Sequence, residues 1–152
     1  MIRVQEKAFD AAAELEQFRH ANRASGATCM FIGTVREMSE GVPIEGMTLE
    51  HYPGMTEKAL AEIEKEALAR WPLEASLIIH RHGRLEPGDD IVLVITASAH
   101  RQAAFAACEF LMDWLKTKAP FWKLEESQGT SRWVDAKDHD DEAARRWDRR
   151  RS

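Results

Sequence analysis

The feature that most constrains the fold is a strand that leads directly into a long helix at residues 91–118. Residues 91–99 are apolar and rich in β-branched side chains, which indicates a strand. Residues 100–118 have helical periodicity, and Pro120 prevents that helix from continuing. The residues expected on its apolar face are Ala104, Phe105, Cys108, Leu111, Met112 and Leu115. A strand followed by such a helix predicts a domain built from both sheet and helices.

Further strands and helices are expected on both sides of this unit. Strands are predicted at residues 2–4, 27–36, 44–52, 77–82, 121–125 and 131–134, and helices after Asp10 and Gly54. The run 27–36 is apolar enough to predict burial on both faces, and 37–43 predicts an exposed loop. Strands 77–82 and 91–99 would form a hairpin. We therefore expect one α+β domain over residues 1–137, followed by a charged tail, 138–152, that is a frayed helix or disordered.

Composition and charge narrow the classes of function. A formal net charge of −5 argues against a nucleic-acid binder that works by neutralising phosphates. No apolar run approaches the roughly 18 residues needed to cross a bilayer, and the N-terminal residues include acids where a signal peptide would be apolar. We expect a cytoplasmic protein that binds neither nucleic acid nor membrane.

The first candidate site is Ser98-Ala99-His100-Arg101, where the strand meets the helix. Free backbone N–H groups and the positive end of the helix dipole favour an anion such as phosphate there, and His100 and Arg101 add further donors. The alternative is that Arg101 caps a surface carboxylate and that His100 packs without a ligand.

The second candidate site is formed by Lys116 and Lys123, around the end of the same helix. Lysines are favoured at a helix C-terminus by the dipole alone, so a solvated surface is the alternative. Phe121 and Trp122 supply an apolar frame, in which a partly desolvated lysine can act as an acid, a base or a nucleophile. Arg36 ends a predicted strand beside a loop, where functional residues are common but solubilising arginines are commoner.

Metal and cysteine chemistry are disfavoured. His80 and His82 would share a strand face, but no carboxylate or third histidine follows at a suitable interval, so no metal site is predicted. Cys29 and Cys108 are expected to be reduced, buried and involved in packing, because neither lies beside a fixed cation at a loop.

Several blocks of sequence carry a family resemblance. In chain order they are Phe31-Ile-Gly-Thr-Val-Arg36, Leu49-Glu-His-Tyr-Pro-Gly-Met55, Ala69-Arg-Trp-Pro72, His80-Arg81 with Gly83, Ser98-Ala-His-Arg101, and Lys116 through Lys123. In this combination they resemble the large, catalytic subunit of molybdopterin synthase, the MoaE family. The resemblance covers about residues 2–137.

The resemblance implies a fold and an activity. The fold would be an α/β hammerhead-like domain with an added antiparallel β subdomain, acting as a homodimer. Each end of the dimer would bind a small ubiquitin-like sulfur-carrier subunit, whose C-terminal Gly-Gly thiocarboxylate gives sulfur to cyclic pyranopterin monophosphate. Two transfers would form the dithiolene of molybdopterin. No cofactor is implied for this subunit's own step.

The same resemblance implies roles for individual residues. They are Lys116 and Lys123 as essential lysines, Arg36, His100 and Arg101 as the anion pocket, and Phe31 and Met112 as the channel for the carrier tail. We assign Lys123 to substrate positioning and charge stabilisation, and Lys116 to proton transfer and stabilisation of the carbon–sulfur intermediate. At Lys137 some relatives have an arginine. The ammonium group of lysine cannot form the two parallel hydrogen bonds of an arginine guanidinium, so the contact that the arginine would make is in doubt.

Two functions of other classes stay open. A non-catalytic module that binds a phosphorylated ligand or a ubiquitin-like partner would keep the anion pocket but give Lys116 no chemical role. A persulfide enzyme would use Cys29 or Cys108 instead.

Overall fold

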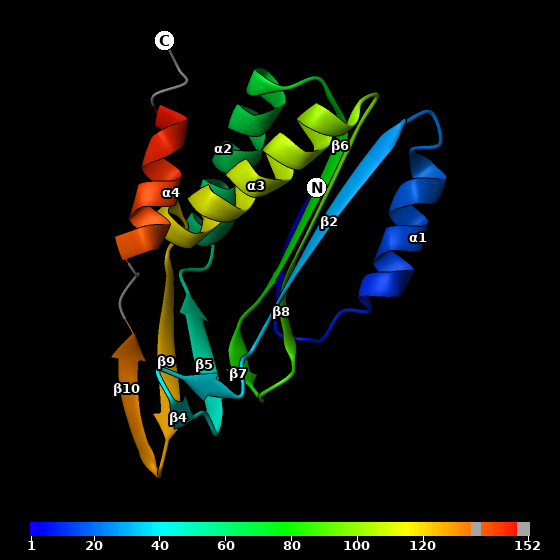
Figure 1. Ribbon diagram of the computed structural model, residues 1–152. Coiled ribbons are helices and arrows are strands. Elements are labelled where there is room, and N and C mark those ends of the chain that lie inside the picture. The colour runs from blue at the N-terminus through cyan, green and yellow to red at the C-terminus, as the bar shows by residue number, and fades with distance from the viewer. Residues whose placement is uncertain (135–137, 149–152) are drawn as a thin grey trace.

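The first of two four-stranded sheets forms the centre of the molecule (Figure 1). The computed structural model describes residues 1–134 and 138–148. In spatial order the strands of this sheet are β1 (Ile2–Gln5), β6 (Leu73–Arg81), β8 (Asp90–Ser98) and β2 (Ala27–Thr34). β1 runs parallel to β6, and the other two pairs are antiparallel. This sheet is therefore mixed.

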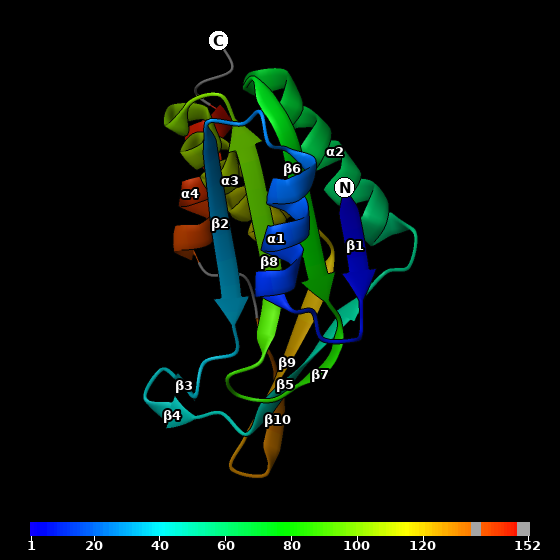
Figure 2. The same ribbon diagram turned by 90° about the vertical axis from the view of Figure 1, so that its right-hand side faces the viewer.

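Helices cover both faces of this sheet (Figure 2). Helix α1 (Ala11–Ala21) lies on one face, and α2 (Met55–Arg70) and α3 (Arg101–Lys118) lie on the other. Because side chains alternate along a strand, Ile79 and Leu93 pack toward Phe18 of α1, whereas Ile78 and Val94 pack toward α2 and α3. No helix in the described part of the chain is long and apolar enough to span a membrane.

The second sheet forms the added β subdomain, and the predicted α+β class is confirmed. Its order is β10 (Thr130–Val134), β9 (Phe121–Ser127), β5 (Gly46–His51) and β7 (Gly83–Leu85), with every pair antiparallel. The predicted loop 37–43 contains a small hairpin of β3 (Met38–Ser39) and β4 (Val42–Pro43). Glu40 and Gly41 make its turn, both with positive φ.

The prediction that strand 27–36 is buried on both faces is wrong. β2 is an edge strand that pairs only with β8, as Figure 2 shows. The side chains of Met30 and Phe31 are each 38% exposed. The pairing of β2 with β8 has a register shift between Gly33 and Thr34. The molecule therefore presents an unpaired, partly apolar strand edge.

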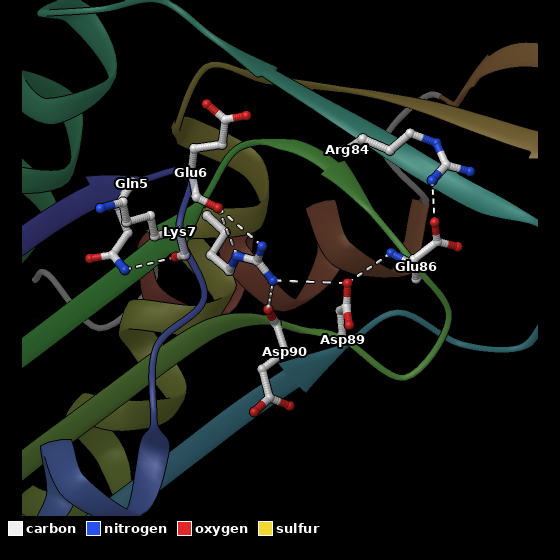
Figure 3. Close-up of polar contacts among 8 residues, drawn as sticks. Gln5, Glu6, Lys7, Arg84, Glu86, Asp89 and Asp90 are labelled. Carbon is white, nitrogen blue, oxygen red and sulfur yellow. Dashed lines mark hydrogen bonds and ion pairs between the residues drawn. The ribbon is translucent and has the colours of Figure 1, made fainter.

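The predicted hairpin of β6 and β8 is confirmed as a pair, but its connection is longer than a turn. The chain leaves β6 at Arg81, enters the second sheet as β7, and returns to β8. At this junction the Arg81 guanidinium donates hydrogen bonds to the backbone carbonyls of Glu6 and Asp90 and lies 4.0 Å from the Asp89 carboxylate. Figure 3 shows that the network continues from Asp89 through Glu86 to Arg84 of β7, which belongs to the second sheet.

Residues 138–148 form helix α4 (Asp138–Asp148), which packs on α3. The helix was one of two predicted alternatives, but its buried face was not expected. Trp147 is only 2% exposed, and its Nε1 donates to the Asp113 carboxylate at 2.6 Å. Arg146 forms ion pairs with Asp113 and with Glu109. This part of the charged tail is therefore joined to the core.

Candidate active site

A pocket of about 550 Å³ lies where the end of β2, the second half of α3 and the start of β9 meet. Five of the seven site residues predicted from the sequence line it. They are Phe31, Arg36, Met112, Lys116 and Lys123. The pocket thus joins side chains from β2, α3, β9 and the segment that follows β2, which are far apart in the sequence.

The periodicities of helix and strand explain why these side chains converge. Met112 and Lys116 are four residues apart on α3 and therefore lie on one face of the helix. Along β9, Phe121, Lys123 and Glu125 alternate with outward-facing residues, so all three point to the same side of the strand. The pocket lining includes each of the three.

Among the residues that the structure describes, Lys123 has a counterion, whereas Lys116 and Arg36 have none. Lys123 Nζ lies 3.2 Å from Glu125 Oε1, and the Glu125 side chain is only 5% exposed. A buried carboxylate needs such a partner, because an uncompensated buried charge is costly. Within residues 1–134 and 138–148, no carboxylate forms a salt bridge with Arg36 or Lys116. These two exposed cations are therefore available to an anionic ligand.

His80 also lines the pocket, and sequence reasoning considered it only as a metal ligand. Its ring stacks on Phe121 with centroids 3.8 Å apart, and its Nδ1 lies 2.8 Å from the Arg81 carbonyl oxygen. Burial, with a smaller contribution from the Lys116 charge, lowers the pKa of His80 to about 4. The sequence could have indicated that His80 faces inward. Side chains alternate along a strand, so His80 lies on the same face of β6 as the core residue Ile78, two residues earlier.

The remaining predicted residues, His100 and Arg101, lie outside this pocket. They stand at the N-terminus of α3 and line a separate hollow of about 460 Å³ with Gly26 and Ala27. Both side chains are exposed, and His100 makes no capping hydrogen bond. Within one chain, therefore, the two predicted anion-binding groups lie at opposite ends of the same helix. Lys137 lies outside the described residues.

His82 does not share the surroundings of His80. His82 lies beyond the end of β6 and stacks on His51 at 4.1 Å, away from Phe121, which His80 contacts. No cluster of three or more His, Cys, Asp or Glu suited to a metal ion occurs among the residues that the structure describes.

Cys108 is buried as predicted, but Cys29, on the edge strand, is only partly buried. Burial, and then the neighbouring Cys29, raise the pKa of the Cys108 thiol. The thiolate form that nucleophilic sulfur chemistry requires is therefore disfavoured at Cys108.

Comparison with known proteins agrees with this geometry. The family model described as "MoaE protein" matches residues 4–118. The molybdopterin synthase catalytic subunit of Pseudomonas aeruginosa is 55% identical over 147 residues, which cover 97% of this chain and 98% of that protein. The subunit of the same name from Ralstonia nicotianae is 55% identical over 146 residues, covering 96% and 83%.

A solved structure shows the same fold. The molybdopterin biosynthesis MoaE protein from Burkholderia ambifaria superposes with a TM-score of 0.83 at 51% identity, and the match covers 97% of each chain. The family model spans well over half of the chain, and these relatives are similar along almost all of it. The chain belongs to the MoaE protein family.

Proposed function

We propose that this protein is the catalytic subunit of a molybdopterin synthase. It takes sulfur from the C-terminal thiocarboxylate of a small ubiquitin-like carrier subunit and transfers it to cyclic pyranopterin monophosphate, forming the dithiolene of molybdopterin. The names of relatives at 55% identity support this function. The observation that carries it is the single pocket that Phe31, Arg36, Met112, Lys116 and Lys123 share.

The charges of the pocket suit both reactants. A thiocarboxylate and a cyclic phosphate are anions, and they must be held together despite their mutual repulsion. Arg36 and Lys116 have no carboxylate partner within the described residues and can compensate these charges. We assign proton transfer to Lys116, because it lines the pocket one helical turn from the channel side chain Met112 and has no carboxylate partner within the described residues. Lys123, held by Glu125, positions the substrate.

We further propose that the site is completed by a second copy of the chain. The exposed edge of β2 has unpaired backbone groups, which a two-fold related β2 can satisfy by antiparallel pairing. Ala27, at the start of β2, pairs with Ser98 beside the α3 N-terminus, whereas the other end of β2 leads to Arg36. Antiparallel pairing therefore brings His100 and Arg101 of one copy toward the pocket of the other. A homodimer with two such sites follows.

We place this protein in the cytoplasm, on the basis of the biosynthetic role that the names of its relatives state. Each pocket would receive one carrier tail, with Phe31 and Met112 as the walls of its channel.

The test is reconstitution from purified components. The protein is mixed with a thiocarboxylated carrier and cyclic pyranopterin monophosphate, and the dithiolene product is measured after oxidation to a fluorescent pterin. Product is expected only with the thiocarboxylated carrier, and the carboxylate form of the same carrier is the control. Tight binding of the carrier without any product would contradict the proposal and favour a non-catalytic binding module.

A further inference from the structure

A connection of only two residues separates helix α3 from strand β9. Ala119 and Pro120 lie between the end of the helix and the start of the strand. Lys116 is in the last turn of the helix, four residues before Pro120, and Lys123 follows Pro120 by three residues. The path of the backbone at Pro120 therefore sets where the two pocket lysines stand relative to each other.

The carbonyl oxygen of Pro120 is held by a side chain from a distant part of the sequence. Thr56, in the first turn of α2, donates a hydrogen bond from Oγ1 to this oxygen at 3.0 Å. Because proline has no N–H, the carbonyl is the only backbone group through which Pro120 can be hydrogen-bonded. The Thr56 hydroxyl therefore fixes the connection at the point where the backbone passes from helix to strand.

The Thr56 hydroxyl is itself held at the start of α2. Its Oγ1 accepts a hydrogen bond from the Tyr52 N–H at 3.0 Å, and the Thr56 N–H donates to the Tyr52 carbonyl oxygen at 2.8 Å. A hydroxyl has one proton, and since the backbone N–H of Tyr52 is the donor in its own contact, that proton is left for Pro120. Thr56 is fully buried, so water does not replace either bond when it is lost.

The residues before Thr56 contact the start of β9 as well. His51 is the partner of Phe121 in the register of β5 and β9, and the Tyr52 ring packs edge-on against the Trp122 ring, with centroids 4.5 Å apart. His51, Tyr52 and Thr56 do not line the pocket. This turn therefore acts on the pocket through the backbone of β9 and of the connection that precedes it.

We propose that Thr56 is a positioning residue for the reaction: its hydrogen bond to Pro120 sets Lys116 and Lys123 at the separation that sulfur transfer needs. The inference rests on the proposed function, because both lysines act in the same pocket. Both are cations, so their mutual repulsion favours a larger separation. A connection released at Pro120 would allow that movement, and a displacement of about 1 Å at a reacting group costs about a hundredfold in rate.

The experiment compares variants of the full-length protein in the reconstituted reaction. T56V keeps the branched shape of the side chain but removes the hydroxyl, whereas T56S keeps the hydroxyl and loses a methyl group. T117V is the matched control, because Thr117 is next to Lys116 but its hydroxyl donates to the Asp113 carbonyl within α3. T56V should lower kcat by about ten- to a hundredfold without changing the affinity for the carrier. T56S and T117V should keep a kcat near that of the wild type.

A loss of stability alone does not produce this pattern. T56S opens a small cavity and T56V leaves two buried backbone groups without a partner, so both should unfold at a lower temperature than the wild type. Only T56V should lose kcat. T56C keeps a weak donor, so its kcat should lie between those of T56S and T56V, and it replaces T56V if that variant does not fold. Wild-type kcat in folded T56V or T56C would overturn the proposal, as would a loss in T56S equal to theirs.

A second measurement does not depend on turnover. Hydrogen exchange of the backbone amides of residues 119–123 is followed by mass spectrometry of peptides from each folded variant. Exchange there should be about tenfold faster in T56V than in the wild type, and unchanged in T56S and T117V. An unchanged rate in T56V would contradict the role of Thr56. If the wild type itself makes no product, the proposed function fails, and the exchange rates still decide whether Thr56 holds the connection between the two lysines.

Discussion

Arg101 and Lys116 lie at opposite ends of helix α3, about 22 Å apart along its axis at 1.5 Å per residue. One small substrate cannot contact both side chains within a single chain. Both residues belong to the same site only if Arg101 is supplied by a second copy. The exposed edge of β2 provides the surface through which that copy can be reached.

Mixed dimers test this arrangement directly. K116A and R101A should each be almost inactive alone, because each lacks one half of every site. A dimer with one copy of each has one site that combines the intact Lys116 of the R101A chain with the intact Arg101 of the K116A chain. Mixing and re-equilibrating the two variants should therefore restore activity, measured as product per dimer, to a substantial fraction of the wild-type value.

The control for this experiment is the double variant K116A/R101A mixed with wild-type chains. Its mixed dimers have one site without Lys116 and one without Arg101, so it should contribute no activity beyond that of the remaining wild-type dimers. If the two single variants stay inactive after exchange of their chains has been verified by mass spectrometry, Arg101 does not reach the pocket of its partner.

Removing Lys116 should abolish chemistry but not assembly. K116A removes the assigned proton donor, and such groups typically contribute about 10² to 10⁴ in rate. The carrier should still bind with near wild-type affinity, measured by calorimetry, because its tail contacts apolar walls as well. K118A is the matched control: Lys118 is on the same last turn, but its Nζ lies 4.2 Å above the Trp114 ring. Comparable rate losses in both variants would remove the special role of Lys116.

The cysteines should be dispensable for sulfur transfer. Burial raises the pKa of the Cys108 thiol, which keeps it protonated, and Cys29 packs against the same core. The double variant C29A/C108A is therefore expected to retain full kcat in the reconstituted reaction, with a modest loss of thermal stability from the small cavities it creates. A large loss of kcat in a folded double variant would instead support a persulfide mechanism.

Helix α4 should contribute measurably to stability. Trp147 is buried against Phe110 and Trp71, so W147A should lower the free energy of unfolding by about 3–5 kcal/mol in urea titrations. The control is R145A, because Arg145 lies on the same helix but is exposed. This variant should change the free energy of unfolding by less than about 0.5 kcal/mol. An unchanged midpoint for W147A would mean that α4 does not stay docked in solution.

Long periodic elements could be predicted from the sequence, and positions that depend on distant partners could not. Helix α3 follows the predicted bounds closely, because its 18 residues repeat one apolar pattern. β7 has three residues, too few for any periodicity, and so the path of the chain through the second sheet was missed. The apolar residues of β2 predicted burial, but sequence alone does not tell a buried central strand from an edge that a second copy can cover.

The candidate site was predictable to a similar degree. Lys116, Lys123 and Arg36 were found because their charges stand beside strand and helix ends. Glu125 and His80 were not assigned to the pocket, although strand parity places each on its inner side. The alternation of side chains predicts which face of a strand a residue lies on. Only the structure, in which β9, β6 and α3 meet, shows that this face of β6 and β9 lines a pocket.

The buried, neutral His80 should also make stability depend on pH. Its pKa is about 4 in the folded protein and about 6.5 in an unfolded chain, so between these values the unfolded state binds more protons. Stability should therefore fall as pH drops from about 6.5 toward 4, by up to about 3 kcal/mol from this group, and the contribution should level off below pH 4. The folded H80F variant lacks the group, so its unfolding free energy should decline less over this window than that of the wild type. Urea titrations at half-unit steps of pH measure both curves, and parallel curves would show that His80 is not held neutral by burial.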